Sequence, residues 1–206
     1  IHLRAGEVFH NRPCSFNNHG TAVTIKELFF NMPARKKFLK SNTTEIHQVL
    51  NTFIPYALLH HDIQFHLTHG NKDLVKTTLS SNRVKRVAEI LNFDESHLIE
   101  IQQDFPEREI SVRLVLGNIN IKRTRRDMQF VFVNNRPVQN KSISFHMNQI
   151  YRLIMPPELY PLFVVDITVP TKNVDVNIHP TKREVKLKNE QDICSILRSL
   201  SEQALM

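Results

Sequence analysis

Residues 174–187 read Val-Asp-Val-Asn-Ile-His-Pro-Thr-Lys-Arg-Glu-Val-Lys-Leu, and this stretch decides the fold that we expect for the chain. Its first half alternates apolar and polar residues, which is typical of a half-buried β-strand. Pro180 has a fixed φ and no backbone N–H, so the strand must stop there. Alternation resumes from Val185 to Leu187. The pattern predicts two strands joined by a sharp turn that holds Lys182 on a rigid base.

A lysine on a rigid turn can be aimed at an anion, because its ammonium group is a compact point charge. A solvated basic turn is the plainer alternative, and it is the more common meaning of an isolated basic turn. The rest of the chain has to decide between these two interpretations of Lys182.

Charge outside this turn favours a polyanionic partner. The 206 residues include 27 Lys and Arg against 20 Asp and Glu, a formal net charge of +7, and such an excess points towards nucleic acid. Each basic group alone would be a solvated face, but four together favour a phosphate-binding surface. The groups lie at positions 35–37 with Lys40, at Arg83, Lys85 and Arg86, at 122–126, and at 182–188.

Composition argues against several other classes of protein. A hydrophobic content of 41% and a charged content of 23% are those of an ordinary globular protein with one large or two small domains. The two cysteines, Cys14 and Cys194, lie far apart, which argues against a disulfide framework and for a reducing cytoplasm. The most apolar run, residues 162–169, is too short to span a bilayer, so we expect no membrane contact.

Hydrophobic periodicity predicts a first group of elements before residue 80. Apolar residues recur at helical spacing from Ile46 to Leu58, with Thr43 or Thr44 as the helix cap and Pro55 inside the helix. The other elements predicted here are a strand over 20–26, a short basic segment over 34–39, and a hairpin of strands 63–67 and 74–78.

A second group of elements begins near residues 80–82, and we predict a domain boundary at about residue 81. A helix capped by Ser81 or Asn82 follows, and a last helix starts at Asn189 with acidic residues in its first turn. The pair Asn134-Asn135 suits a tight turn, since Asn tolerates positive φ. The remaining predictions are strands at 97–102, 109–116, 128–134, 161–169, 174–179 and 184–188, and a helix at 141–154. This mixture of antiparallel strands and helices predicts an α+β fold.

The residues by themselves show no complete active site. His60, His61, His66 and His69 have no cysteine among them, and surface or capping roles are commoner for such histidines than metal ligation. The sequence has no Ser-His-Asp or Cys-His signature and no glycine-rich phosphate loop. We therefore predict no catalytic residue and no metal site in this chain.

Two further motifs accompany the opening turn. Residues 20–39 read Gly-Thr-Ala-Val-Thr-Ile-Lys-Glu-Leu-Phe-Phe-Asn-Met-Pro-Ala-Arg-Lys-Lys-Phe-Leu, and residues 130–138 read Phe-Val-Phe-Val-Asn-Asn-Arg-Pro-Val. The second motif places Arg136 at a strand end, shortly after the basic residues 122–126. For Arg136 taken alone, a surface salt bridge is the commoner role.

Together these three stretches resemble the MutL family of DNA mismatch repair proteins. The family pattern runs GTxVxVxxLFxNxPARxKFL, then FVNxRxV, then DVNVHPxKxEVxF. All three motifs occur here in that order, and the similarity covers nearly the whole chain. The resemblance implies that residues 1–80 are the C-terminal part of a GHKL-type ATPase sandwich. Residues 82–206 would then be its transducer domain, an α+β fold shared with some ribosomal proteins and with gyrase-type topoisomerases.

The resemblance also assigns roles to single residues. Lys182 takes the place of a transducer lysine that contacts the γ-phosphate of ATP, and Gly20 and Thr21 resemble nucleotide-pocket residues. Arg136 is implicated in contact with the DNA backbone. We add the basic loop to this DNA-binding set, namely Lys122, Arg123, Arg125 and Arg126.

Other family features are missing from this chain. The catalytic Glu, the metal-binding Asn, the Asp-x-Gly-x-Gly motif and the glycine-rich lid are not in the sequence, which begins at Ile1 without an initiator Met. We expect a fragment that neither binds ATP well nor hydrolyses it and needs no cofactor alone. The intact parent would be a slow ATPase that uses ATP and Mg, and some family members are also endonucleases.

DNA mismatch repair is the predicted function, with the chain coupling nucleotide state to conformation and DNA contact. The expected partners are DNA, a second copy or a paralogue in a dimer, and a mismatch-recognition protein of the MutS type. A bacterial cytoplasm is the favoured location, or the nucleus in a eukaryote. Two alternatives stay open: the transducer of another GHKL ATPase such as a gyrase B-like subunit, and a ribosomal-like RNA-binding module.

Overall fold

The computed structural model describes residues 1–4, 6–12, 19–175 and 184–206. The turn predicted to carry Lys182 lies outside the described residues. The chain divides into two compact units, Ile1–Leu50 and Asn51–Met206. The second unit includes residues on both sides of position 81, and the domain boundary proposed there stays a prediction.

The first unit contains little regular structure. Strands β1 (His2–Arg4) and β2 (Glu7–His10) pair antiparallel, and the short helix α1 (Pro33–Lys36) follows. The predicted strand over 20–26 is wrong, because these residues have no regular secondary structure and are all exposed. A strand is held by a neighbouring strand, and no described strand pairs with this segment. The predicted helix after it is confirmed as α2 (Asn42–Leu59), which contains Pro55.

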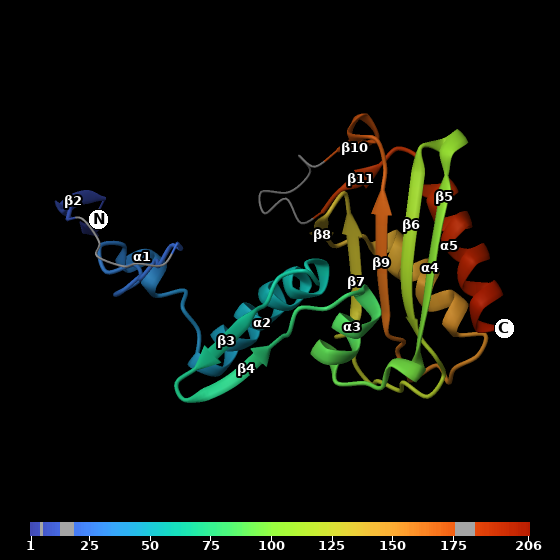
Figure 1. The fold of residues 1–206 in the computed structure, drawn as a ribbon, viewed down its shortest axis with the longest axis horizontal. Helices are drawn as coiled ribbons and strands as arrows, with labels where there is room; N and C mark the ends of the chain where they lie inside the picture. The colour runs from blue at the N-terminus through green and yellow to red at the C-terminus, as the bar shows by residue number, and fades with distance from the viewer. Residues whose placement is uncertain (5, 13–18, 176–183) are drawn as a thin grey trace. The chain divides into compact units, whose positions relative to one another are not determined.

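The second unit is built on a mixed β-sheet (Figure 1). Among the described residues its five strands follow the order β5-β6-β9-β7-β8; β7 and β9 run parallel, and the other neighbours run antiparallel. The strands are β5 (Leu98–Phe105), β6 (Ile110–Gly117), β7 (Gln129–Val133), β8 (Arg136–Val138) and β9 (Phe163–Thr168). The predicted α+β fold is confirmed.

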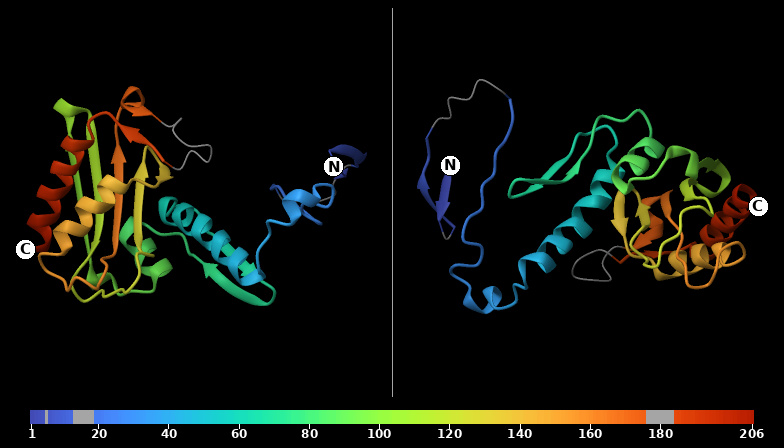
Figure 2. Two further views of the ribbon diagram at one scale, coloured as in Figure 1. Left: turned by 180° about the vertical axis from the view of Figure 1, so that it is seen from behind. Right: turned by 90° about the horizontal axis from the view of Figure 1, so that it is seen from below.

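Helices cover both faces of this sheet, as Figures 1 and 2 show. Helices α4 (Lys141–Tyr151) and α5 (Glu190–Leu205) pack on one face, and α3 (Arg83–Leu91) packs on the other with the end of α2. Val131 and Val133 belong to the core under α4 and α5, whereas Phe132 belongs to the core under α3. A strand buried on both faces needs a continuous apolar run, which is what β7 has.

The other elements are smaller. Strands β3 (His66–His69) and β4 (Lys72–Lys76) form the predicted hairpin, and Asn82 caps α3 as predicted, accepting a hydrogen bond from Lys85 N. Asn189 occupies the N-cap position of α5 as predicted, but its side chain makes no capping hydrogen bond in the described structure. The acidic residues of the first turn of α5 are left to interact with its N-terminal dipole. The single-turn 3₁₀ helices are η1 (Glu95–His97), η2 (Pro106–Arg108) and η3 (Thr171–Asn173).

Segments of two of the sequence motifs lie at one end of the sheet, where the strands terminate. The parallel strands β7 and β9 both end there, and the turn from β7 to β8 uses Asn134 and Asn135 at φ 49° and 59°. Two left-handed residues are what a tight two-residue hairpin turn requires, so the predicted turn is confirmed. Asn134 Oδ1 accepts a hydrogen bond from Val169 N at 2.9 Å. Strands β10 (Val174–Asp175) and β11 (Lys186–Leu187) then continue from the end of β9 (Figure 1).

Candidate functional site

Arg136 is presented at the rim of the sheet. It is the first residue of β8 and lies opposite Val133 in the antiparallel register. Opposite residues of an antiparallel pair point to the same face, so Arg136 lies on the side of the sheet that α4 and α5 cover. Its side chain is exposed, and it makes no ion pair within the described ranges. Its guanidinium is therefore available to an anion.

The basic loop, residues 122–126, contains two kinds of cation. Two of its arginines contact another side chain, and the other two cations are exposed without an ion pair in the described structure. Arg123 Nη2 pairs with Asp127 Oδ2 at 2.9 Å, and its side chain is 37% exposed. The Arg126 guanidinium carbon lies 4.8 Å from the centre of the Tyr160 ring, which is cation–π distance. Lys122 and Arg125 are exposed and have no ion-pair partner in the part of the chain that the structure describes.

The structure does not bring Arg136 and the basic loop together. Residues 122–126 lead into the start of β7, whereas Arg136 follows its end. Five strand residues separate the ends by about 13 Å. The predicted DNA-binding set is therefore two basic points at opposite ends of one strand, and each would contact a different part of a nucleic acid.

Of the predicted nucleotide-binding residues, the structure describes Gly20 and Thr21. Gly20 and Thr21 are exposed in the first unit. A Cβ placed on Gly20 would meet no described atom within 4 Å, so the described residues provide no close cradle there. Lys182 lies outside the described residues. The described residues therefore do not test the nucleotide site by geometry.

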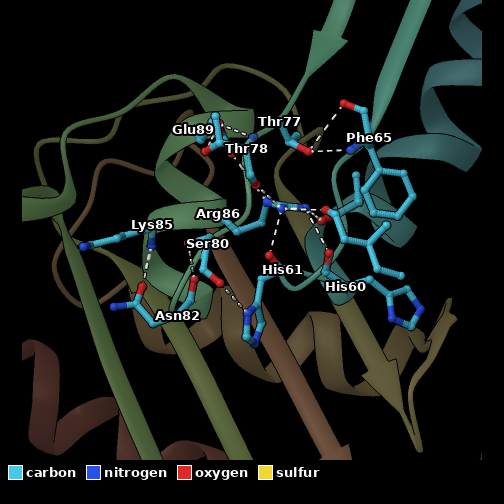
Figure 3. A network of polar contacts seen from close by, with 12 residues as sticks. His60, His61, Phe65, Thr77, Thr78, Ser80, Asn82, Lys85, Arg86 and Glu89 are labelled. Atoms are coloured by element: carbon cyan, nitrogen blue, oxygen red, sulfur yellow. Dashed lines mark hydrogen bonds and ion pairs between the residues drawn. The ribbon is translucent and has the colours of Figure 1, made fainter.

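Arg86, which the sequence placed in a basic surface group, is buried on the opposite face of the sheet. Arg86 of α3 has no exposed surface, and its guanidinium donates to backbone carbonyls from three segments (Figure 3). The acceptors and distances are Ala57 O at 2.8 Å, His60 O at 3.0 Å, His61 O at 2.9 Å, Ile63 O at 2.8 Å and Thr78 O at 2.7 Å.

This network has a structural explanation. The last carbonyls of a helix have no partner inside the helix, and they carry partial negative charge. Arg86 supplies donors for Ala57 and for His60, the residue that follows α2. Glu89 lies 3.5 Å from Arg86 Nε and accepts from Thr78 N at 2.8 Å. Burial lowers the pKa of Arg86, and the Glu89 and Asp62 carboxylates oppose that shift. Arg86 thus joins α3 to the end of α2 and to the segments that precede β3 and follow β4.

Arg83 is also buried on this face. Its side chain is 5% exposed, and its Nη2 pairs with Asp166 Oδ2 of β9 at 2.8 Å. The prediction that the group at 83–86 contributes to a phosphate-binding surface is therefore wrong for both arginines, and Lys85, the exposed member that remains, is a single cation and not a basic group. The helical phase was the available signal, because Arg83 and Arg86 fall on the same stripe as the apolar Val87.

His66 and His69 are exposed, as predicted for surface residues, whereas His60 and His61 are partly buried. His66 Nε2 lies 2.7 Å from Asp73 Oδ1 across the β3–β4 hairpin, and both side chains are about half exposed. Among residues 1–4, 6–12, 19–175 and 184–206, no three His, Cys, Asp or Glu side chains form a group that could hold a metal ion. A search of the same residues finds no helix with the length and apolar character needed to cross a membrane.

The sequence matches a known family and known relatives. Residues 90–206 match the family described as "DNA mismatch repair protein, C-terminal domain". The DNA mismatch repair protein MutL of Clostridium acetobutylicum is 32% identical over 200 residues, covering 96% of this chain and 31% of the relative. That of Endomicrobium trichonymphae is 35% identical over 189 residues, covering 91% of this chain and 31% of the relative. The chain thus spans about a third of the length of these curated relatives.

Two solved structures resemble the fold. The MutL ATPase domain of Aquifex aeolicus complexed with ADP has a TM-score of 0.55 and 27% identity, covering 70% of this chain and 50% of that one. The N-terminal domain of a DNA repair protein has a TM-score of 0.69 over 85% of this chain and 58% of that one. Its identity is 22%, so it supports the fold alone.

Proposed function

The chain belongs to the MutL family of DNA mismatch repair proteins, and we propose that it couples nucleotide state to conformation and to contact with DNA. In this proposal residues 1–80 are the C-terminal part of the ATPase domain and residues 82–206 are the transducer. The parent binds ATP and Mg, forms a dimer with a second copy or a paralogue, and works with a mismatch-recognition protein of the MutS type in the bacterial cytoplasm.

The observation that carries the DNA contact is the presentation of Arg136. A tight turn of two left-handed asparagines fixes the start of β8, and a hydrogen bond from Val169 N fixes the first of them. The guanidinium is exposed on this rigid support. An arginine held in this way can bind a phosphate in a fork geometry at little entropic cost, so Arg136 is proposed to contact the DNA backbone.

The nucleotide part of the proposal rests on the motifs. Lys182 is proposed to sense the γ-phosphate of ATP, with Gly20 and Thr21 contributing to the pocket in the complete ATPase domain. The geometry adds one support: β10 and β11, which flank the predicted Lys182 turn, leave the same end of the sheet as the turn before Arg136. In this proposal a change at one of these segments reaches the other through the ends of β7 and β9.

The DNA contact can be tested by fluorescence anisotropy of the full chain with a labelled duplex. We expect binding at about 50 mM salt that weakens steeply by about 200 mM, because phosphate neutralisation releases counterions. Arg136→Gln should weaken binding, whereas Lys85→Gln, an equal change of charge on α3, should not. Absence of binding at the lower salt, or equal affinity for structured RNA with no effect of Arg136→Gln, would contradict the proposal.

The nucleotide role needs the longer parent protein that includes the rest of the ATPase domain. We expect Lys182→Ala to reduce ATP turnover or ATP-driven dimerisation, since the variant loses the charge proposed to recognise the third phosphate. Dimerisation is measured by light scattering with and without ATP. Unchanged turnover and unchanged dimerisation would together remove Lys182 from this role.

A further inference from the structure

The outer face of α4 lies between the two basic points of the proposed DNA contact. Apolar residues of α4, including Ile143 and Ile150, face the sheet. The exposed positions Lys141, Phe145 and Arg152 recur at spacings of four and seven residues, so they form one stripe directed away from the core. Lys141 begins this stripe, and Arg152 ends it.

The C-terminal end of α4 lies next to the basic loop. Asn148 exchanges two side-chain hydrogen bonds with Gln129, the first residue of β7, at 2.9 and 3.1 Å. Arg126 and Arg152 line one small cavity together with Asn148 and Tyr160. The cation at the end of α4 is thus beside the cation that leads into β7.

The N-terminal end of α4 lies near Arg136 in the chain. Lys141 follows the last residue of β8, Val138, by three positions. Val138 shares the face of Val133 and packs in the core under α4, as expected for the face that also holds Arg136. The stripe on α4 therefore runs on the same side of the sheet as both basic points.

The stripe has no opposing charge of its own. Helix α4 contains no Asp or Glu, and neither Lys141 nor Arg152 forms an ion pair with any described residue. The carboxylate of the adjoining loop, Asp127, is already paired with Arg123. Helix α4 consequently carries a cation at each end and no carboxylate of its own. Glu190 of the neighbouring α5 lines a separate cavity with Ser142 and His146.

The length of the stripe is compatible with duplex DNA as the ligand. Lys141 and Arg152 are eleven residues apart, which corresponds to about 17 Å along a helix. Adjacent phosphates of one strand are spaced by only 3.4 Å along the duplex axis, whereas the major groove is about 12 Å wide. Lys and Arg have long side chains that extend from the helix, so two cations at this separation can reach phosphates on the two sides of a groove, which a duplex holds in fixed positions.

We propose that Lys141 and Arg152 bind backbone phosphates of duplex DNA that lies along α4 between Arg136 and Arg126. This inference rests on the proposed DNA contact and extends it with two residues that the sequence motifs do not include. The contact involves phosphates alone, so it should be independent of base sequence.

Lys141→Gln and Arg152→Gln test this proposal in the full chain, with Lys85→Gln as the matched control on the opposite face. Affinity for a labelled duplex is measured by anisotropy at several salt concentrations. Each variant should bind about twofold to fivefold more weakly at low salt, the range of an exposed charge contact. The slope of log affinity against log salt should become shallower by about 0.9 for each variant. Lys85→Gln should change neither quantity.

The outcomes separate this inference from the function it extends. If Arg136→Gln weakens binding while Lys141→Gln and Arg152→Gln match Lys85→Gln, the α4 contact is wrong and the proposed function stands. If the unmodified chain does not bind duplex at low salt, both are wrong. Equal losses for duplex and for a single strand of the same length would also overturn the duplex assignment.

Discussion

The two faces of the sheet use the same side chain in opposite ways. Under α3, Arg83 and Arg86 are almost completely buried, and their guanidinium groups are bound to protein oxygens. On the other face, Arg136 and Arg126 are exposed. Arg136 has no ion-pair partner in the described part of the chain, and Arg126 rests on an aromatic ring.

This difference shows how a basic chain divides its arginines between folding and binding. A buried charge must be matched by partners, because removal from water costs several kcal/mol. The carbonyls around Arg86 and the carboxylate of Asp166 provide that match. An exposed arginine needs no partner inside the protein and keeps its charge for a polyanion. Net charge alone therefore overstates the surface that can bind DNA.

The largest effect is expected for Arg86→Met. The substitution keeps most of the side-chain volume but leaves as many as five backbone carbonyls without their donor. Each buried unsatisfied group costs about 1–3 kcal/mol, with water entering to offset part of the sum. We expect the free energy of unfolding to fall by about 3–5 kcal/mol, measured by urea denaturation followed by circular dichroism.

Arg136→Met is the matched control for that experiment. The same change at an exposed position should alter the free energy of unfolding by less than about 0.5 kcal/mol. A loss below 1 kcal/mol for Arg86→Met would mean that water satisfies these carbonyls easily. The arginines on the two faces would then differ in exposure but not in their contribution to the free energy of unfolding.

The second effect concerns the buried ion pair. Asp166→Asn leaves Arg83 charged in a site where it is 5% exposed, and breaking a buried pair costs about 3 kcal/mol or more. The double variant Arg83→Met/Asp166→Leu removes both charges and should recover much of that loss. Glu202→Gln, which breaks the exposed pair with Arg198, should cost no more than about 0.5 kcal/mol.

A double-mutant cycle measures the coupling between Arg83 and Asp166. It compares the unmodified protein, Arg83→Met, Asp166→Leu and the double variant. If the double variant loses as much stability as the sum of Arg83→Met and Asp166→Leu alone, the two side chains act independently. That result would contradict a buried charge pair and would attribute the losses to packing around Phe132, above which Arg83 also lies.

The sequence predicted the second unit well because its signals were local. The Asn134-Asn135 turn, the Asn82 cap and the alternating strands each depend on a few neighbouring residues. The order of the strands in the sheet depends on contacts between distant residues, which periodicity does not encode. The strand predicted at 20–26 failed for the same reason, because alternation shows that a segment could pair but not that a partner exists.

The sequence identified the residues of the candidate site, but it did not predict their positions relative to one another. Arg136 and the basic loop were found in the sequence, whereas their placement at opposite ends of β7 follows only from the register. The stripe of α4 was not recognised, since Lys141 and Arg152 are single cations without a motif. The nucleotide role of Lys182 stays a prediction.

The smallest effect is expected at Arg123, which is neither buried like Arg86 nor, among the described residues, free of an ion pair like Arg136. Arg123 is 37% exposed and is paired with Asp127 at 2.9 Å, so it belongs fully to neither group. Asp127→Asn should free Arg123 and remove one negative charge from the basic loop. Affinity of the full chain for duplex DNA should then rise by about twofold to fivefold at low salt.

Asp73→Asn is the control for this last variant, because it also removes one carboxylate from an exposed pair, on the β3–β4 hairpin. It should leave DNA affinity unchanged if the effect is local to the loop. Weaker binding by Asp127→Asn would mean that Asp127 holds Arg123 in its binding position. The loop would then combine both uses of arginine, with one internal partner orienting a cation that still reaches the DNA.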